Sequence, residues 1–344
     1  MKRNRYLILL GSVAGIFMLI IDGQTALTGA SEGIELCIKT VIPSLFPFFV
    51  LSSMLTSSLM GTSIGFLRPF FHCLGVPSGA ESLVVTGFLG GYPVGAQSVA
   101  SAYRDGVLTK NIAQRMLAFC NNAGPTFLFG MVSSVFPDRW MVWMLWVIHI
   151  LGAIFAALMI PNKDTAPVKP VKGHILNLSA AIVASIRVMG VVCAWIVLFR
   201  ILIAFLNRWF LWLLPTSLQV AIMGVLELAN GCCALEQIAD VNLRFVICSG
   251  MLAFGGICVT MQTVSVTNGL SLKQYFLGKT IQTAFSVIAA ASVCLTPSKY
   301  AIVPMMLILT VLFLLQISKK TLHSPKNYCI MKKIIKRGHD HAVS

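Results

Sequence analysis

The chain has 344 residues, of which 57% are hydrophobic and only 11% are charged. A soluble domain of this length needs far more charge to cover its surface, so the composition excludes an ordinary soluble protein. The net charge of +15 does not indicate nucleic acid, because the basic residues cluster between apolar runs, as in cytoplasmic loops. We therefore expect an all-α polytopic membrane protein with no nucleic-acid partner.

The first part of the chain predicts one helix followed by a membrane-embedded repeat. Residues 1–33 are expected to hold a first transmembrane helix, over 2–22, and then an outer loop. Its charged start and apolar run resemble a signal peptide, but without a clean cleavage site we expect an uncleaved helix with its N-terminus in the cytoplasm. Residues 34–161 form the predicted first repeat, which begins with a kinked span over 35–60.

Two interrupted apolar segments follow in this first repeat. Glycines and Pro93 cut the segment 83–103 into two pieces, each about half a membrane long. Such a segment most simply enters and leaves on the same side, so we predict a re-entrant hairpin. The segment 112–136 is predicted to be a helix broken at Asn121–Pro125, and a span over 140–160 crosses back.

The second part of the chain repeats this plan. A cytoplasmic linker, 162–179, precedes a second repeat over 180–317. This repeat holds a second hairpin over 210–238 and a second broken helix over 244–266, and a basic cytoplasmic tail over 318–344 follows it. Further spans of the second repeat are predicted near 180–206, 275–295 and 300–317.

The distribution of charge predicts the orientation. Most of the 26 Lys and Arg residues, Arg115 and Lys279 included, fall in segments that we assign to the cytoplasm, together with both termini. The acidic stretch 231–242 is assigned to the outside. The first broken helix then runs outward and the second inward, which makes an inverted repeat. Such repeats place a binding site near the midplane of the bilayer, between discontinuous helices.

The two helix breaks would free backbone groups that cannot be left bare in lipid. Pro125 removes a donor, and Asn121 and Asn122 add amide groups beside it. The alternative is a Pro-kinked helix whose asparagines bond a neighbouring helix. Arg200 either snorkels outward or faces the interior, paired with Glu227 or an anionic substrate. The candidate substrate-binding residues are Gly91, Tyr92, Gly95, Gln97, Ser98, Asn121, Asn122, Thr126, Arg200, Glu227, Asn230, Gly255 and Gly256.

Motifs for catalysis, metals or cofactors are lacking. The ten cysteines form no CxxC pair, and no Walker or G-x-S-x-G motif occurs. His149, alone in an apolar span, is predicted to donate a hydrogen bond to another helix and not to bind a ligand. We expect no enzyme, no catalytic residue, no metal and no cofactor. The expected partners are a small anionic solute and the lipid bilayer, and a homo-oligomer stays an open alternative.

The run "GFLGGYPVGAQSVASAYRDGVLT", followed by "MLAFCNNAGPTFLFGMV", resembles the sporulation integral membrane protein YlbJ family. This family is a branch of the nucleoside-recognition Gate domain proteins. The resemblance is sharpest over 83–136 and extends through the architecture to 34–295. It implies a fold similar to that of concentrative nucleoside transporters, in which hairpin tips and unwound helices hold the substrate.

The resemblance also implies a function. The YlbJ branch is associated with endospore formation and with moving dipicolinate from the mother cell across the outer forespore membrane. We therefore expect a transporter or facilitator of a small anionic solute, in the bacterial cell membrane or the outer forespore membrane. The alternatives are a nucleoside transporter of the Gate family and a sporulation membrane scaffold that does not transport.

Overall fold

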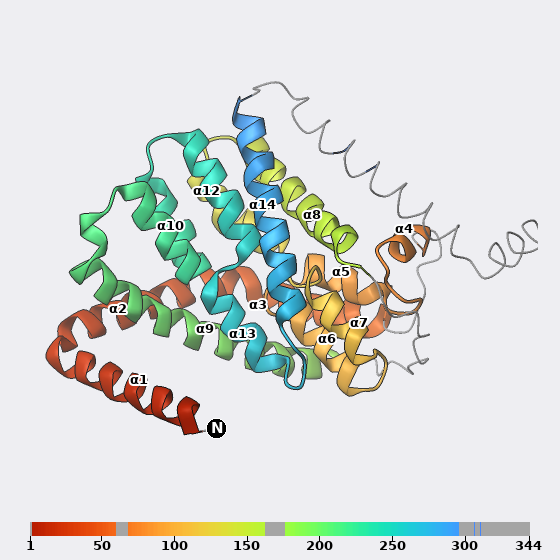
Figure 1. Cartoon of the computed structure of the whole chain (residues 1–344), viewed down its shortest axis with the longest axis horizontal. Coiled ribbons are helices and arrows are strands. Elements are labelled where there is room, and N and C mark those ends of the chain that lie inside the picture. Colours follow the sequence, from red (N-terminus) through yellow and green to blue (C-terminus); the bar gives the residue numbers. More distant parts are fainter. Residues whose placement is uncertain (1, 60–67, 162–175, 296–305, 307–309, 311–344) are drawn as a thin grey trace, which may run out of the picture.

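The structure, a computed structural model, describes residues 2–59, 68–161, 176–295, 306 and 310 (Figure 1). All regular elements in these ranges are helical. The α-helices are α1 (Lys2–Ile21), α2 (Gly23–Leu36), α3 (Ile42–Leu59), α4 (Arg68–Cys73), α5 (Glu81–Leu89), α6 (Val94–Arg104), α7 (Lys110–Leu117), α8 (Arg139–Met159), α9 (Leu178–Trp209), α10 (Thr216–Leu226), α11 (Leu228–Ala234), α12 (Val241–Phe254), α13 (Gly256–Val266) and α14 (Lys273–Leu295). Turns of π-helix (Cys37–Val41, Phe127–Met131) and 3-10 helix (Val132–Val135, Leu211–Leu213, Leu235–Gln237) complete them.

Five helices of the described ranges are long and apolar enough to cross a membrane: Gly23–Leu59, Arg139–Met159, Leu178–Trp209, Val241–Val266 and Lys273–Leu295. The described residues therefore confirm the predicted all-α class and the presence of helices that can cross a membrane. The expected first transmembrane helix is helical, but its apolar part, Leu9–Ile21, is shorter than the other five. The tail 318–344, most of the span near 300–317 and most of the linker 162–179 lie outside the described residues.

The prediction of a loop before residue 34 was wrong, because this stretch forms helix α2. The Asp22 carboxylate caps the helix by accepting from the Thr25 amide, at 3.3 Å, and from the Thr25 hydroxyl, at 2.9 Å. The hydroxyl bond also holds the pKa of the Asp22 carboxyl below its usual value. The stretch is rich in Gly, Ala, Ser and Thr, and small residues of this kind let membrane helices pack closely.

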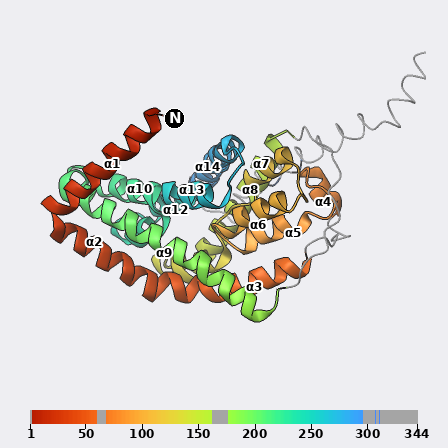
Figure 2. The same cartoon turned by 90° about the horizontal axis from the view of Figure 1, so that it is seen from below.

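Helices α2 and α3 join through the π-helical turn into one long helix that lies antiparallel to α9 (Figure 2). Gly29 and Gly33 bring the two backbones together, since a Cβ at Gly33 would lie 3.0 Å from the Val197 Cα. Two ion pairs join the same helices, Glu32 with Arg200 at 2.6 Å and Asp22 with Arg208 at 3.1 Å. Close packing and opposite charges therefore hold this helix pair together.

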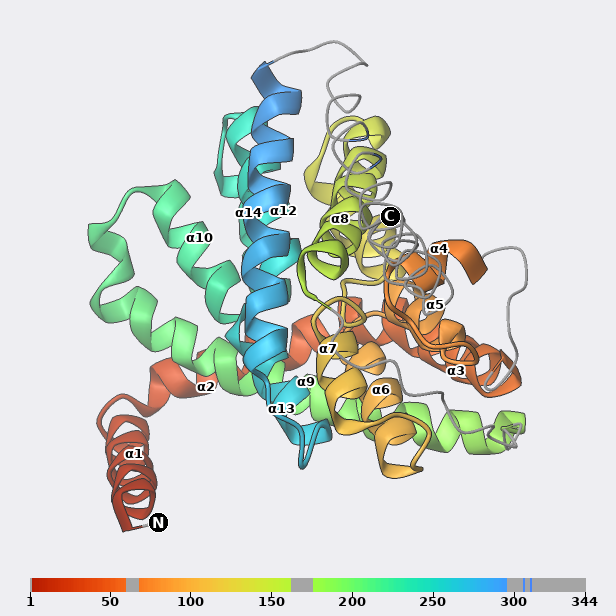
Figure 3. The same cartoon turned by 45° about the vertical axis from the view of Figure 1, so that its right-hand side comes forward.

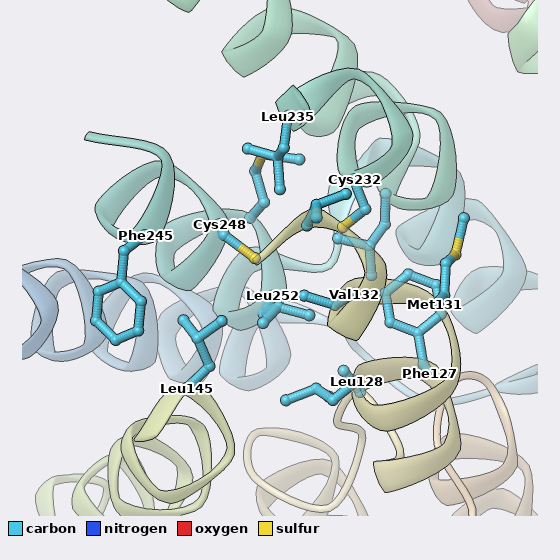
Figure 4. Packing of buried hydrophobic residues seen from close by; sticks show 14 of the residues in the cluster. Phe127, Leu128, Met131, Val132, Leu145, Cys232, Leu235, Phe245, Cys248 and Leu252 are labelled. Atoms are coloured by element: carbon cyan, nitrogen blue, oxygen red, sulfur yellow. The ribbon is translucent and has the colours of Figure 1, made fainter. Parts of the chain in front are cut away.

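Helices α8, α12 and α14 stand side by side and cross the direction of α2 and α9 (Figures 1 and 3). An apolar cluster fills the space between α8, α11, α12 and the segment after Thr126 (Figure 4). Leu128, Val132 and Leu252, fully buried, lie at its centre. Residues on or beside both helix breaks belong to this cluster, so the breaks are held by close packing.

Candidate functional site

The turn between α5 and α6 packs directly on the backbone of the first helix break. Gly87 and Gly95 face the Cys120 carbonyl, and a side chain at either position would collide with it. Gly91, at the tip of the turn, has a positive φ of 73° and lies against Gly124, where a Cβ would come within 3.1 Å of the Gly124 amide nitrogen. The glycines of the G-Y-P-x-G motif therefore seat the turn on the broken helix.

The first broken helix has the interruption that the sequence predicts, because α7 ends at Leu117 and residues 118–124 are not helical. The freed backbone groups find partners within the protein. The Ala123 N–H donates to His149 Nε2 at 3.0 Å, and the Asn122 amide donates to the Phe119 carbonyl at 2.6 Å. His149 thus bonds another segment, as predicted, although it accepts the hydrogen bond.

Asn121 links this break to two further elements. Its side-chain oxygen accepts from the Ala96 N–H at 3.2 Å, and its amide donates to the Thr263 hydroxyl at 2.9 Å. The side chain is fully buried. Asn121 therefore ties the N-terminal end of α6 to α13 through the broken helix, which is the kind of interhelical bonding that the alternative interpretation described.

The second interruption falls at Gly255 and Gly256, between α12 and α13, as predicted. Both glycines have a positive φ, of 82° and 85°, which other residues rarely adopt. The ring of Tyr92 packs on Gly255, where a Cβ would lie 3.0 Å from the Tyr92 Cζ. The Tyr92 hydroxyl donates to the Leu252 carbonyl at 3.1 Å, in the last turn of α12. Tyr92 therefore connects the α5–α6 turn to the second break.

The turn between α10 and α11 is organised by Glu227, which is only 2% exposed. Its carboxylate accepts from the Ala229 N–H at 3.0 Å and from the Asn230 N–H at 2.6 Å. The Asn230 side chain adds a third bond, at 2.7 Å. A buried carboxylate is thus held at the start of α11. The first N–H groups of a helix have no partner inside the helix, and they favour a negative charge at this position.

A central cavity of about 40 Å³ lies where these parts converge. The α5–α6 turn contributes Gly91 and Tyr92, the first break contributes Ala123 and Gly124, and the α10–α11 turn contributes Glu227. Polar side chains reach it from Tyr92, Glu227 and Gln262. The remaining wall is largely apolar: Val41, Leu45, Phe127, Val192, Ile196, Leu228, Ala229 and Val259.

The other candidate residues do not line the central cavity. Asn121 and Asn122 are buried behind it, and Gly95, Gly255 and Gly256 serve backbone packing. Thr126 precedes Phe127 of the lining, and its buried hydroxyl has no hydrogen-bond partner among the described residues. Gln97 and Ser98 on α6 are half-buried and stay outside the lining.

Arg200 does not pair with Glu227, which corrects one of the two expectations for it. Its guanidinium donates to the Glu32 carboxylate on α2, at 2.6 and 3.0 Å. The pair borders two outer cavities of about 280 Å³ each, and Asn230 lines one of them. Because α2 was expected to be a loop, the sequence offered no partner for Arg200 on that side.

Arg115 and Lys279 were assigned to cytoplasmic positions, and the sequence did not indicate that both side chains are buried, on α7 and α14. Arg115 donates to the Ala157 carbonyl at 2.8 Å and the Ile160 carbonyl at 3.2 Å, where α8 ends. Lys279 donates to the Tyr92 hydroxyl at 3.0 Å and to Gln282 Oε1 at 2.9 Å. The spacing of Lys279 and Gln282 on one face of an apolar helix was the signal that could have revealed this cluster.

Comparison with known proteins agrees with the resemblance found in the sequence. "Sporulation integral membrane protein YlbJ" of Bacillus subtilis (strain 168) is 24% identical over 316 residues, which cover 77% of this chain and 76% of that protein. This chain is a relative of YlbJ. That relative is named as an integral membrane protein, which agrees with the five membrane-length apolar helices of this chain. No protein-family model matches the chain, and no solved structure matches it.

Proposed function

We propose that this relative of YlbJ is not an enzyme but a membrane transporter or facilitator of a small anionic solute. The proposed solute is dipicolinate, which leaves the mother cell toward the forespore during sporulation. The observation that carries the proposal is the central cavity. It lies between two helix-pair turns and beside a helix break, in a protein with five apolar helices of membrane-crossing length. A scaffold has no reason to keep costly polar groups at such a place.

The proposed architecture is an inverted repeat, supported by the order of the elements. In the first half the α5–α6 pair precedes the broken helix, and a single long helix, α8, follows. In the second half the α10–α11 pair precedes the α12–α13 break, and α14 follows. We assign both pairs as re-entrant hairpins, because each piece is too short to span a bilayer by itself.

The size of the central cavity implies that the described form is a closed one. Ligand pockets usually measure about 300–1,000 Å³, far more than the 40 Å³ found here. A solute can therefore enter only when the two turns move apart. Movement of elements around a midplane site is how such inverted repeats give access to one side at a time.

A positive charge close to the central cavity supports an anionic solute. Lys279 Nζ lies 5.0 Å from the centre of the Tyr92 ring, and that ring lines the cavity. The membrane potential can supply the driving force. A dianion that moves outward from a negative interior gains about 4.6 kcal/mol at 100 mV, so neither ATP nor a coupling ion is required.

The second candidate function is nucleoside transport, which the Glu227 carboxylate favours. A carboxylate in the cavity lining disfavours a dianion but accepts hydrogen bonds from the hydroxyl groups of a neutral sugar. The Gln262 side chain at the same cavity offers both a donor and an acceptor. The two candidates therefore differ in the charge of the solute, and a flux assay separates them.

The test is purified protein in liposomes, with an imposed potential and with either labelled dipicolinate or labelled uridine. We expect saturable dipicolinate flux that rises with the potential. The matched control is Gly124→Val, which should lose flux because the added side chain would collide with Gly91 and displace the α5–α6 turn from the break. Uridine flux without dipicolinate flux would instead establish a nucleoside carrier. Flux of neither solute through stable protein would favour the scaffold.

A further inference from the structure

Lys279 carries a buried positive charge, and the proposed transport of an anion does not explain why this charge lies against neutral partners. The residue is 1% exposed on α14, and none of the ion pairs among the described residues involves it. The ammonium group instead lies among neutral oxygen atoms, the Tyr92 hydroxyl at 3.0 Å and Gln282 Oε1 at 2.9 Å. The nearby Tyr92 ring, whose face carries partial negative charge, adds a cation–π contact.

These neutral groups connect the ammonium to both helix breaks. Gln282 donates to the Asn122 side-chain oxygen at 3.0 Å, in the first break, and to the His149 carbonyl at 3.1 Å. Tyr92 donates to the Leu252 carbonyl at 3.1 Å, at the C-terminal end of α12 and next to the second break. One positive charge is therefore the hub of a hydrogen-bond network that holds the α5–α6 turn and both breaks in place.

Transporters with discontinuous helices commonly hold Na⁺ at such places, with oxygen atoms of unwound backbone and the negative ends of half-helices as ligands. In this protein the Lys279 ammonium group lies among oxygen atoms beside the C-terminal end of α12. A Na⁺ ion at the same point would meet a like charge and would lose Tyr92 and Gln282 as ligands. We propose that the Lys279 ammonium is a tethered cation that takes the place of a coupling Na⁺ at the helix breaks.

The proposal deepens the proposed transport function, because it states that the solute moves without Na⁺ bound at this place. Its decisive test does not depend on transport. The unfolding temperature of the purified protein is measured in detergent, in NaCl, in methylammonium chloride and in N-methyl-D-glucamine chloride of equal ionic strength. A cation that binds the folded state raises the unfolding temperature in a saturable way, and a cation that binds no site does not.

We expect the wild-type protein to show the same unfolding temperature in all three salts. We expect Lys279→Ala to unfold at a lower temperature, and to recover part of the loss in NaCl or methylammonium chloride with a saturable dose response. The matched control is Lys273→Ala, at the exposed start of the same helix, which should behave as wild type in every salt. A purely structural lysine would lower the unfolding temperature without creating this dependence on small cations.

Two results would overturn the proposal. One is a saturable stabilisation of the wild-type protein by Na⁺, which decides the matter even if Lys279→Ala fails to fold. The other is a folded Lys279→Ala protein that gains no dependence on small cations. In liposomes, wild-type flux should be equal with Na⁺ and with N-methyl-D-glucamine, and a dependence on Na⁺ of tenfold or more would also contradict it. A wild type that moves neither solute refutes the proposed function, while the unfolding measurement still decides this inference.

Discussion

Single buried polar side chains satisfy the backbone groups that the helix breaks set free. His149 is the clearest case, since its Nε2 atom accepts the Ala123 N–H at 3.0 Å and the side chain is 2% exposed. Because the imidazole is buried, bulk water cannot replace it, so the Ala123 N–H depends on this acceptor.

We predict that His149→Leu lowers stability by about 1–3 kcal/mol, because it leaves a buried N–H without an acceptor. His149→Gln should recover part of this loss, since its side-chain oxygen can accept the same bond. Thermal unfolding in detergent measures both variants, with Met159→Leu, on an exposed part of α8, as the control. Equal unfolding temperatures for the Leu and Gln variants would show that packing, and not the hydrogen bond, matters at this position.

The sequence indicated the residues that form the two helix breaks but not the residues that hydrogen-bond to them. Asn121, Asn122, Gly255 and Gly256 stand out because polar or flexible residues are unusual in apolar runs. Lys279 was missed because counting of positive charges treats every lysine as a loop residue. Its burial depends on Tyr92, which is distant in the sequence, and no local pattern shows that contact.

Among the elements, the pair formed by α2 and α9 depends on close approach of two backbones. A Cβ at Gly29 would lie 2.9 Å from the Ala204 Cβ and 3.0 Å from the Ile201 Cα. No side chain fits there without moving one helix away from the other.

We predict that Gly29→Leu lowers the unfolding temperature and reduces the yield of monodisperse protein, with a cost of about 1–3 kcal/mol from overpacking. Gly190→Leu on α9 is the matched control, because a Cβ at Gly190 meets nothing within 4 Å. Size-exclusion chromatography after a series of heating steps measures both. The close crossing would be disproved if both variants resisted heating equally.

Prediction of the elements succeeded where glycine and proline interrupt an apolar run and failed where the run was polar. The α5–α6 pair and both breaks follow from such interruptions, whereas the α10–α11 turn falls at Glu227 and Gly231 lies inside α11. Helix α2 did not, since its Thr, Ser and Gly residues are typical of loops until a partner helix is known. The two ion pairs with α9, at Asp22 and Glu32, explain why acidic residues occur on this helix.

At the scale of the whole molecule, the contacts between loops define two ends. Arg104, the last residue of α6, donates to the carbonyl of Val266, the last residue of α13, at 3.2 Å, so the α6–α7 and α13–α14 loops share one end. Arg244, at the start of α12, donates to the Val135 carbonyl at 2.6 Å, which places the start of α8 with it. The predicted orientation requires the same grouping of segments, and the placement of the first end in the cytoplasm stays a prediction from the charges.

We predict that single cysteines at Asp105 and Lys273, on a cysteine-free background, react with a membrane-impermeant maleimide only from the cytoplasmic side. Cysteines at Glu236 and Asp240 should react only from the outside. All four positions are exposed, so access to the reagent is not limited by the protein itself. Labelling of Asp105→Cys and Glu236→Cys from the same side would rule out the inverted repeat.

The small volume of the central cavity also limits how much water the protein can hold at this place. Protons move along continuous files of hydrogen-bonded water, and about 40 Å³ between apolar walls holds only a few water molecules. The central cavity by itself is too small to hold a file that crosses a hydrocarbon core of about 30 Å. If the protein is the transporter proposed above, its closed form therefore lets a membrane that holds many copies keep the proton gradient that makes ATP.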